Sequence, residues 1–340
     1  MHRYFDLTRF FKKNLEIWNF YVYLCGVLVK YNTASLIKIN HYGLCPRYFG
    51  HRRPLHLNSL IMLKFDALTY RYHKGSDAIS GITATIEPGI CLVLGENGAG
   101  KSTLLGLAGG NFVATSGSVT FDGCNVGARE PDTLSRIFFL PDDYRSPFRT
   151  VRDIVRFHAP FYPNFDADML DANLAAFGLT GTERLKHLSL GMAHKSYIAF
   201  ALALRTSLLL LDEPANGLDI NSKKELRRMV SRCIADDQTV LISTHIVADL
   251  EVLYDSVMVL KRGHAVLSAT TDSIQAALAF VSSPVPVEGA LYIEPDGGAF
   301  RAIVPAAEPY STAADYELLY SAMMSDAASD ITELIKASAR

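Results

Sequence analysis

The sequence predicts an α/β protein with a largely parallel sheet. Three observations favour this class. Apolar strand-like runs alternate with helical patterns through the middle of the chain. The run from Cys91 to Leu94 passes through a glycine-rich stretch into a helical pattern. A smaller β-rich layer is predicted around that run. The 340 residues, of which 49% are apolar and 20% charged, are enough for a substantial core.

The elements follow in order from Met62 onward. Alternation or unbroken apolar character predicts strands, and helical spacing predicts helices that end at proline or glycine. Ser189 is a suitable N-cap for the helix that follows it. Strands are predicted at residues 63–70, 79–86, 91–94, 116–121, 136–141, 208–211, 239–243 and 256–260, and helices after 101, within 150–187, at 189–204, at 221–235 and from 249 to 253.

Charge and cysteine usage narrow the class of protein. The formal net charge is −2, but residues 1–61 hold nine Lys and Arg against two Asp and Glu. The remainder holds 24 basic and 33 acidic residues, and this acidic body argues against a nucleic-acid partner. Five scattered cysteines without a C-x-x-C pair predict reduced thiols in a cytosolic protein.

Residues 1–61 form an N-terminal extension with two interpretations. Their apolar run from Ile17 to Val29 is thirteen residues long, which is too short to cross a bilayer as a helix. The run is either a membrane-surface anchor or part of a stretch outside the working domain. The regular pattern begins at Met62, so we favour the second interpretation, with Met62 as the translation start.

The stretch from Gly95 to Ser102 reads G-x-x-x-x-G-K-S between a predicted strand and a predicted helix. Its glycines can adopt backbone angles that turn consecutive N–H groups toward one anion. The helix that begins there adds unpaired N–H groups and the positive end of its dipole. Lys101 supplies a charge for the β- and γ-phosphates, and Ser102 supplies a hydroxyl for Mg²⁺. The stretch therefore predicts a phosphate-binding P-loop.

A second predicted strand, Leu208 to Leu211, ends in Asp212 and Glu213. A carboxylate at Asp212 can hold Mg²⁺ directly or through water, beside the γ-phosphate. Glu213 can orient and polarise the attacking water. Together with Ser102, these residues predict the working site of a P-loop NTPase.

Residues 62–263 resemble an ATP-binding cassette (ABC) ATPase. Lys101 lies in its Walker A motif, Asp212-Glu213 in its Walker B motif and Leu188–Met192 in its signature motif. Asn216–Asp219 matches the D-loop, His245 matches the switch histidine, and Tyr72 stands where the family stacks an aromatic ring on adenine. The resemblance implies a parallel-sheet core, an antiparallel β subdomain and a helical subdomain that carries the signature.

The resemblance also implies a head-to-tail dimer, either homodimeric or heterodimeric, with ATP between the P-loop of one copy and the signature of the other. Ser189 and the N–H of Gly191 would contact the γ-phosphate in trans, and His245 would help hold Glu213 and water. The expected catalytic residues are Lys101, Glu213 and His245; the expected ATP-binding residues are Tyr72, Gly95, Glu96, Asn97, Gly98, Ala99, Gly100, Lys101, Ser102, Thr103, Ser189, Gly191 and Asp219; and the expected Mg²⁺ ligands are Ser102, Asp212 and Asp142.

Two departures from the family pattern stand out. The signature reads LSLGM in place of the commonest LSGGQ, but its serine and second glycine are present. The family places a glutamine after the Leu-Pro of the Q-loop strand, whereas Asp142 and Asp143 follow Leu140-Pro141 here. Either Asp142 retains the metal role or the coupling to the membrane partner is altered, and the sequence leaves both open.

These observations predict an ATPase domain over residues 62–268 and a small appendix over residues 269–340. The appendix combines a proline-rich β-type part at 283–310 with one terminal helix at 311–338. We expect a cytoplasmic subunit, peripheral on the membrane, that hydrolyses ATP to drive a permease on a separate chain. An exporter is favoured. Residues 161–166 resemble segments of export-type cassettes, and a plain packed turn is the alternative interpretation of this segment.

Three alternative functions of such an ATPase differ in features that the sequence would show. A ribosome-acting ABC protein would carry two cassettes, and a chromosome-type ATPase would carry a coiled-coil insertion between the Walker motifs. Neither feature is present. A regulatory, weakly catalytic cassette is suggested by Asp142.

Overall fold

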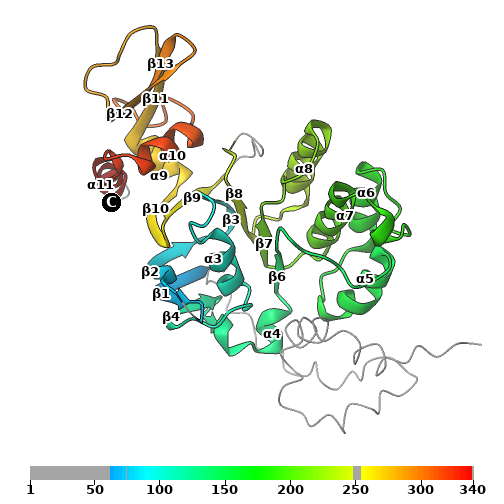
Figure 1. Cartoon of the computed structure of the whole chain (residues 1–340). Coiled ribbons are helices and arrows are strands. Elements are labelled where there is room, and N and C mark those ends of the chain that lie inside the picture. The colour runs from blue at the N-terminus through cyan, green and yellow to red at the C-terminus, as the bar shows by residue number, and fades with distance from the viewer. Residues whose placement is uncertain (1–61, 74, 248–253, 339–340) are drawn as a thin grey trace, which may run out of the picture.

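The computed structural model describes residues 62–73, 75–247 and 254–338 (Figure 1). The N-terminal extension and the helix expected from residue 249 to 253 lie outside the described residues. The strands are β1 (Leu63–Arg71), β2 (Asp77–Ile86), β3 (Gly89–Gly95), β4 (Ser116–Phe121), β5 (Cys124–Asn125), β6 (Ile137–Leu140), β7 (Leu208–Asp212), β8 (Thr239–Thr244), β9 (Ser256–Lys261), β10 (His264–Thr270), β11 (Leu278–Ser283), β12 (Tyr292–Asp296) and β13 (Ala299–Pro305).

Over the described residues, the helices include three short 3₁₀ turns. The α-helices are α3 (Lys101–Ala108), α4 (Pro131–Leu134), α5 (Val151–His158), α6 (Ala167–Ala176), α7 (Leu190–Ala203), α8 (Ile220–Cys233), α9 (Thr271–Ala277), α10 (Tyr316–Met324) and α11 (Ala328–Ser338); the 3₁₀ turns are η4 (Val126–Ala128), η5 (Ala159–Phe161) and η6 (Leu185–His187). Within the described ranges, every helix falls short of the length and apolar content that a membrane span requires.

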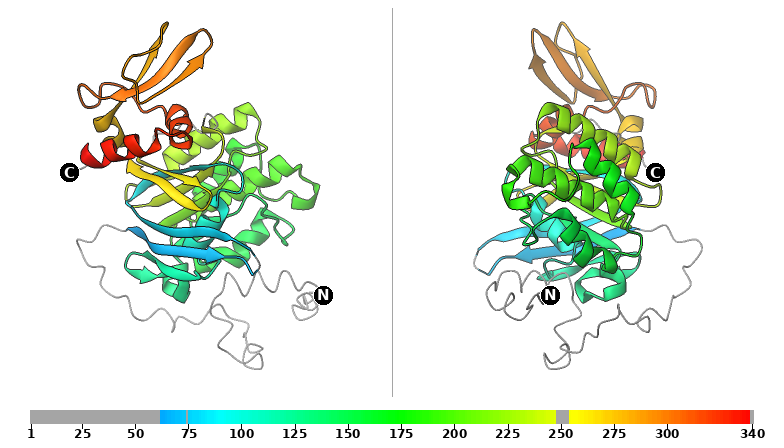
Figure 2. Two further views of the ribbon diagram at one scale, coloured as in Figure 1. Left: turned by 60° about the vertical axis from the view of Figure 1, so that its left-hand side comes forward. Right: turned by 90° about the vertical axis from the view of Figure 1, so that its right-hand side faces the viewer.

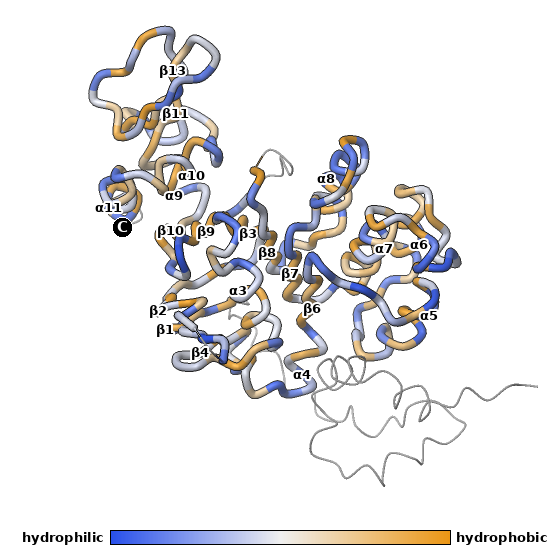
Figure 3. Tube along the Cα trace, viewed as in Figure 1, coloured by the Kyte–Doolittle hydropathy of each residue, from blue (hydrophilic) through white to orange (hydrophobic). Residues whose placement is uncertain are grey.

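A six-stranded sheet forms the centre of the molecule, in the order β10-β9-β3-β8-β7-β6. Strands β9, β3, β8, β7 and β6 pair in parallel, and only the edge strand β10 pairs antiparallel. Both faces of a parallel sheet are covered, so its strands are apolar throughout rather than alternating. The four leucines of β7 are all fully buried. Figure 3 shows the hydropathy of the residues along these strands. The predicted parallel α/β core is confirmed.

Successive side chains along the strands of this sheet pack into two separate hydrophobic cores. Val93, Leu210 and Leu241 pack with α3 and with the antiparallel sheet β2-β1-β4-β5. Leu92, Leu209 and Val240 belong to the other core, together with residues of α5 to α8. Figure 2 shows these helices in green, beside the central sheet. Because successive strand residues point to opposite faces, one strand can serve both cores at once. Helices α3 and α7 therefore pack against opposite faces of the sheet.

The C-terminal segment combines the antiparallel sheet β11-β13-β12 with α9, α10 and α11. Its helices share a core with the central sheet, since Leu319 and Ile331 cluster with Val257 and Val259. The expected boundary at residue 268 falls inside β10. The prediction of one terminal helix over residues 311–338 is wrong.

The terminal helices are separate because of the residues between them. Helix α10 ends at Met324, where the Ser325 hydroxyl donates to the carbonyl of Ala322 and accepts from the N–H of Ala327. A serine side chain that satisfies backbone groups in this way competes with helix continuation. The second helix then begins at Ala328.

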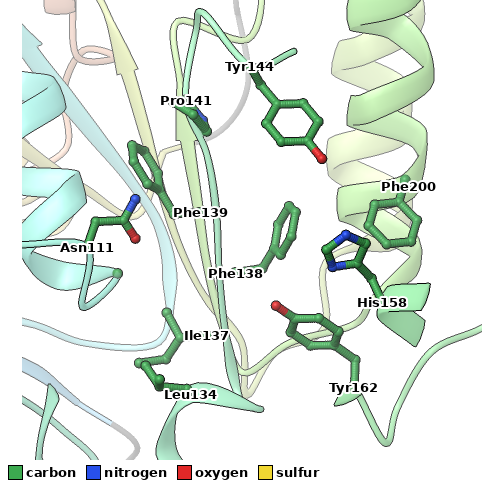
Figure 4. Close-up of a pocket in the computed structure, with 11 residues that line it drawn as sticks. Asn111, Leu134, Ile137, Phe138, Phe139, Pro141, Tyr144, His158, Tyr162 and Phe200 are labelled. Carbon is green, nitrogen blue, oxygen red and sulfur yellow. The ribbon is translucent and has the colours of Figure 1, made fainter. Parts of the chain in front are cut away.

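A small aromatic cavity lies between β6 and the helices α5 and α7 (Figure 4). It measures about 50 Å³, and Phe138, Tyr162 and Phe200 line it together with His158. A nucleotide site requires several hundred Å³, so this cavity is not one. His158 is buried, and its Nε2 atom has no hydrogen-bond partner among the described residues.

Burial lowers the pKa of His158 to about 4, because the charged imidazolium is poorly solvated there. The unfolded chain takes up this proton near pH 6.5, whereas the folded chain does not until about pH 4. Stability therefore falls as the pH drops through this window. Between pH 7 and pH 5, wild type should lose about 2 kcal/mol more than His158→Gln.

Urea unfolding at both pH values measures this difference. The same substitution at the exposed His187 is the matched control, and it should reproduce the wild-type pH dependence. Equal pH dependence in wild type and His158→Gln would contradict the assignment.

Candidate functional site

The candidate site lies where the carboxyl ends of three neighbouring parallel strands meet. Strand β3 leads into the P-loop, β7 ends at Asp212, and β8 ends directly before His245. Since β8 pairs with both β3 and β7, these three ends lie side by side. In open parallel sheets, ligands bind at this edge.

The P-loop depends on left-handed glycines. Gly98 has φ +83° and Gly100 has φ +106°, and Gly100 is the N-cap residue of α3. A Cβ atom at Gly100 would stand 2.7 Å from the carbonyl oxygen of Ala78, so only glycine fits there. The N–H of Ala99 donates to the carbonyl of Glu96 at 3.0 Å, which closes the loop.

Lys101 is the buried cation of the site, with only 6% of its side chain exposed. Its ammonium nitrogen lies 2.7 Å from the carbonyl oxygen of Gly95, 3.3 Å from that of Glu96 and 3.2 Å from Oε1 of Glu213. An ammonium group has three N–H donors, so these three acceptors satisfy it. The P-loop lysine thus pairs with the Walker B glutamate.

Glu213 links Lys101 to His245. Its Oε2 atom lies 2.9 Å from Nδ1 of His245 and 3.3 Å from the backbone nitrogen of the same residue. A carboxylate only accepts, so this contact requires the proton on Nδ1. Glu213 has φ +47°, a left-handed conformation that is strained for a residue with a side chain.

Ser243 organises the carboxyl end of β7. Its hydroxyl donates to Oδ1 of Asp212 at 2.5 Å and accepts from the N–H of Glu213 at 3.0 Å. Burial raises the pKa of the Asp212 carboxyl, and hydrogen bonds from Ser243 and Ser102 oppose that rise. Ser102, Asp212 and Glu213 are therefore brought together, as the sequence predicts.

Tyr72 lies beside the P-loop helix, with 47% of the residue exposed. Its hydroxyl is 3.0 Å from the hydroxyl oxygen of Thr103. Its ring packs edge-to-face on Tyr70 and Phe112, with centroid distances of 5.0 and 5.9 Å. An exposed ring that is fixed next to the P-loop helix presents a stacking surface for a nucleobase.

The signature residues lie elsewhere. Ser189 caps α7 by accepting from the N–H of Met192 at 3.3 Å, as predicted. Gly191 faces the carbonyl of Gly217, which would stand 3.1 Å from a Cβ atom at residue 191. Asp219 caps α8 and pairs with Lys195 at 3.0 Å. Helix α7, which Ser189 caps, packs against the face of the sheet opposite to α3.

Asp142 directly follows Pro141 after β6. Both of its carboxylate oxygens accept from the side-chain nitrogen of Asn216, at 3.2 and 3.3 Å. The described residues hold no cluster of three or more His, Cys, Asp or Glu side chains arranged to bind a metal ion. Any metal bound here would therefore need oxygen ligands from its substrate or from water as well.

Sequence reasoning missed the parts that Ser243 and Asn216 play. Both residues stand inside recognised motifs, but a motif does not say which hydroxyl or amide reaches a neighbouring strand. The signal was available for Ser243, because a polar residue at the end of an apolar strand beside Asp212 needs a buried partner.

The comparisons with known proteins agree with this geometry. The protein-family model described as "ABC transporter" matches residues 79–216. The Streptococcus pyogenes "Lantibiotic transport ATP-binding protein SrtF" is 30% identical over 213 residues, covering 62% of this chain and 92% of that protein.

The chain belongs to the ABC transporter ATP-binding proteins. This is a family of ATPases, so the predicted family and the predicted enzyme class are confirmed. The Bacillus subtilis "ABC transporter ATP-binding protein YtrB" is also 30% identical, and the chain spans 61% of its length. The solved ABC transporter cassette MJ0796, a dimer, shares the fold with a TM-score of 0.53 at 22% identity, over 61% of this chain and 98% of that one.

Ser243→Ala should destabilise this cassette and slow its ATPase reaction. The change removes the hydroxyl that donates to the buried Asp212 carboxylate and one of the two acceptors of the Glu213 N–H, which costs about 1–3 kcal/mol of unfolding free energy. Urea unfolding and steady-state ATP turnover measure the two effects.

Ser268→Ala is the matched control, because Ser268 is an exposed residue of β10. If Ser243→Ala behaves like that control in both assays, Ser243 does not organise the site.

Proposed function

We propose that this chain is the Mg²⁺-dependent, ATP-hydrolysing subunit of an exporter, acting through a permease on a separate chain. The observation that carries the proposal is the position of Glu213. Its carboxylate stands between the P-loop Lys101 and the switch residue His245, at 3.2 and 2.9 Å. A carboxylate in that position can orient water for attack on a γ-phosphate.

The described residues fit ATP and Mg²⁺. The left-handed glycines let the P-loop turn its N–H groups toward an anion, and Lys101 lies within the loop as a point charge. Ser102 and Asp212 are oxygen ligands already in contact, whereas both carboxylate oxygens of Asp142 accept from Asn216. When bound, Mg²⁺ would neutralise charge between the β- and γ-phosphates.

Each residue of the site then has its own role in ATP binding or hydrolysis. Lys101 exchanges its contact with Glu213 for the phosphates, which releases that carboxylate to hold water. His245 keeps Glu213 oriented through its Nδ1 proton. Tyr72 stacks on the adenine, and Thr103 continues the phosphate site at the start of α3. These roles rest on the positions of the side chains.

The proposal requires two cassettes. Ser189 and Gly191 begin α7, whose N-terminus suits an anion, but α7 packs on the face of the sheet opposite to α3. A second cassette in a head-to-tail arrangement would supply those groups to the γ-phosphate. It is either another copy of this chain or a different cassette subunit.

A basic groove supports a separate membrane partner. It is lined by Arg145, Arg149, Arg184 and Lys186, together with Leu188 and Leu190, and measures about 590 Å³. Among the described residues, none of these four cations has a carboxylate partner within 4.0 Å. An acidic, partly apolar segment of a permease matches this groove, and such docking would hold the subunit at the cytoplasmic face of the membrane. The lantibiotic-transport name of SrtF favours a role in transport.

Glu213→Gln should lower ATP turnover by about 10² to 10⁴, because the water loses its base while the nucleotide contacts remain. The variant should then accumulate as an ATP-bound dimer in size-exclusion chromatography. Glu87→Gln, at an exposed turn, is the matched control and should behave as wild type.

The outcomes separate the alternatives. If the purified variant alone accumulates as an ATP-bound dimer, the chain forms a homodimer. If it does so only with another cassette subunit, the chain forms a heterodimer. A wild-type chain that binds ATP but does not turn it over in either arrangement supports the regulatory function suggested by Asp142. Undiminished turnover in Glu213→Gln contradicts the proposed mechanism.

Charge reversal in the basic groove should release the chain from its membrane partner. The double variant Arg149→Glu/Arg184→Glu should keep basal ATP turnover within about twofold of wild type. It should lose binding to vesicles prepared from the membranes of the native cells, and wild-type binding should weaken with added salt.

Lys64→Glu/Lys336→Glu carries the same charge change at two exposed residues away from the groove and is the matched control. Equal vesicle binding by both double variants would show that the groove is not the docking site.

A further inference from the structure

The contact between Asp142 and Asn216 joins two loops that flank the water-activating carboxylate. Asp142 follows β6, and Asn216 follows β7, three residues after Glu213. The two side chains meet through the Asn216 amide nitrogen, which is shared between both oxygens of Asp142. Asp142 forms no ion pair among the described residues, so the amide is its side-chain partner.

Asn216 also reaches back to the Walker B carboxylate. Its backbone N–H donates to the carbonyl of Glu213 at 2.9 Å, which closes the turn that holds Glu213 in its left-handed conformation. On its other side, the N–H of Glu213 donates to Ser243. The strained residue is thus fixed at both ends, and a displacement of Asn216 moves the carbonyl of Glu213.

The same turn is connected to the signature helix. The imidazole ring of His194, on α7, lies next to the backbone of Asn216. Lys195 pairs with Asp219 at 3.0 Å, and Gly191 faces the carbonyl of Gly217. Asn216 is therefore the residue at which β6, β7 and α7 are joined.

We propose that Asp142 and Asn216 are a positioning pair that sets the Glu213 turn and the start of α7, in place of the family's Q-loop glutamine. The inference rests on the proposed function. A hydrogen bond to an ionised carboxylate is stronger than one between neutral amides, so Asp142 holds the Asn216 side chain more tightly than a glutamine would. The pair acts on the reaction through Glu213 and touches no reacting atom itself.

An exchange of the two residues tests the pair. Asn216→Asp places two carboxylates against each other and should lower kcat about tenfold or more, and Asp142→Asn should lower it less. The double variant Asp142→Asn/Asn216→Asp restores one amide opposite one carboxylate, and should bring kcat back to within about threefold of wild type. The KM for ATP and the Mg²⁺ concentration for half-maximal rate should stay near wild type in all four proteins.

Two results would overturn the proposal. In the first, the exchanged variant is no faster than the slower single variant. In the second, both proteins that carry Asp142→Asn require several-fold more Mg²⁺ than wild type, which assigns Asp142 to the metal instead. Thermal unfolding of all four proteins controls for folding.

If Asn216→Asp does not fold, a double-mutant cycle with Asp142→Ala and Asn216→Ala replaces the exchange. Losses of kcat that are coupled in the double variant support the pair, and losses that are additive overturn it.

The proposed function fails separately if wild type does not hydrolyse ATP. The four proteins are then compared by hydrogen exchange at residues 213–216. Faster exchange in the single variants, with protection restored by the double variant, supports the pair, and equal exchange in all four overturns it.

Discussion

The site depends on one buried ammonium group. Taking the charge of Lys101 out of water is costly unless every N–H finds an acceptor. The chain meets this need with two P-loop carbonyls and Glu213. The P-loop must therefore bend so that its carbonyls face inward, which its left-handed glycines allow. The end of β7 must also lie next to the start of α3, which a parallel sheet covered on both faces provides.

The same pairing sets the order of events in the proposed function. Glu213 is engaged by Lys101 and His245, so a nucleotide must compete for the lysine before the carboxylate can serve water. The groups that would favour a bound γ-phosphate stand at the start of α7, on the opposite face of the sheet. In the proposed function, ATP binding, cassette pairing and release of Glu213 are therefore parts of one equilibrium.

Much of the fold and of the site was predictable from the sequence, because each motif needs particular residue types to form its backbone conformation. The P-loop glycines, the strand ends and the cap at Ser189 are local features, so the spacing of residue types along the sequence predicts them. The Asp142–Asn216 contact and the hydroxyl of Ser243 join residues 74 and 31 positions apart, and only the fold decides such pairings. The two terminal helices were predicted as one, because the break between them depends on hydrogen bonds from a single serine, Ser325, to neighbouring backbone groups. The role of Asp142 toward a metal stays a prediction.

The most direct test is an experimental structure of Glu213→Gln with Mg²⁺ and ATP. The account predicts that the amine of Lys101 lies within hydrogen-bond distance of the β- and γ-phosphates and has left residue 213, while Ser102 and Asp212 surround the metal. It also predicts that Ser189 of a second cassette lies against the γ-phosphate. A structure in which nucleotide binds while Lys101 keeps its contact with residue 213 would contradict the account.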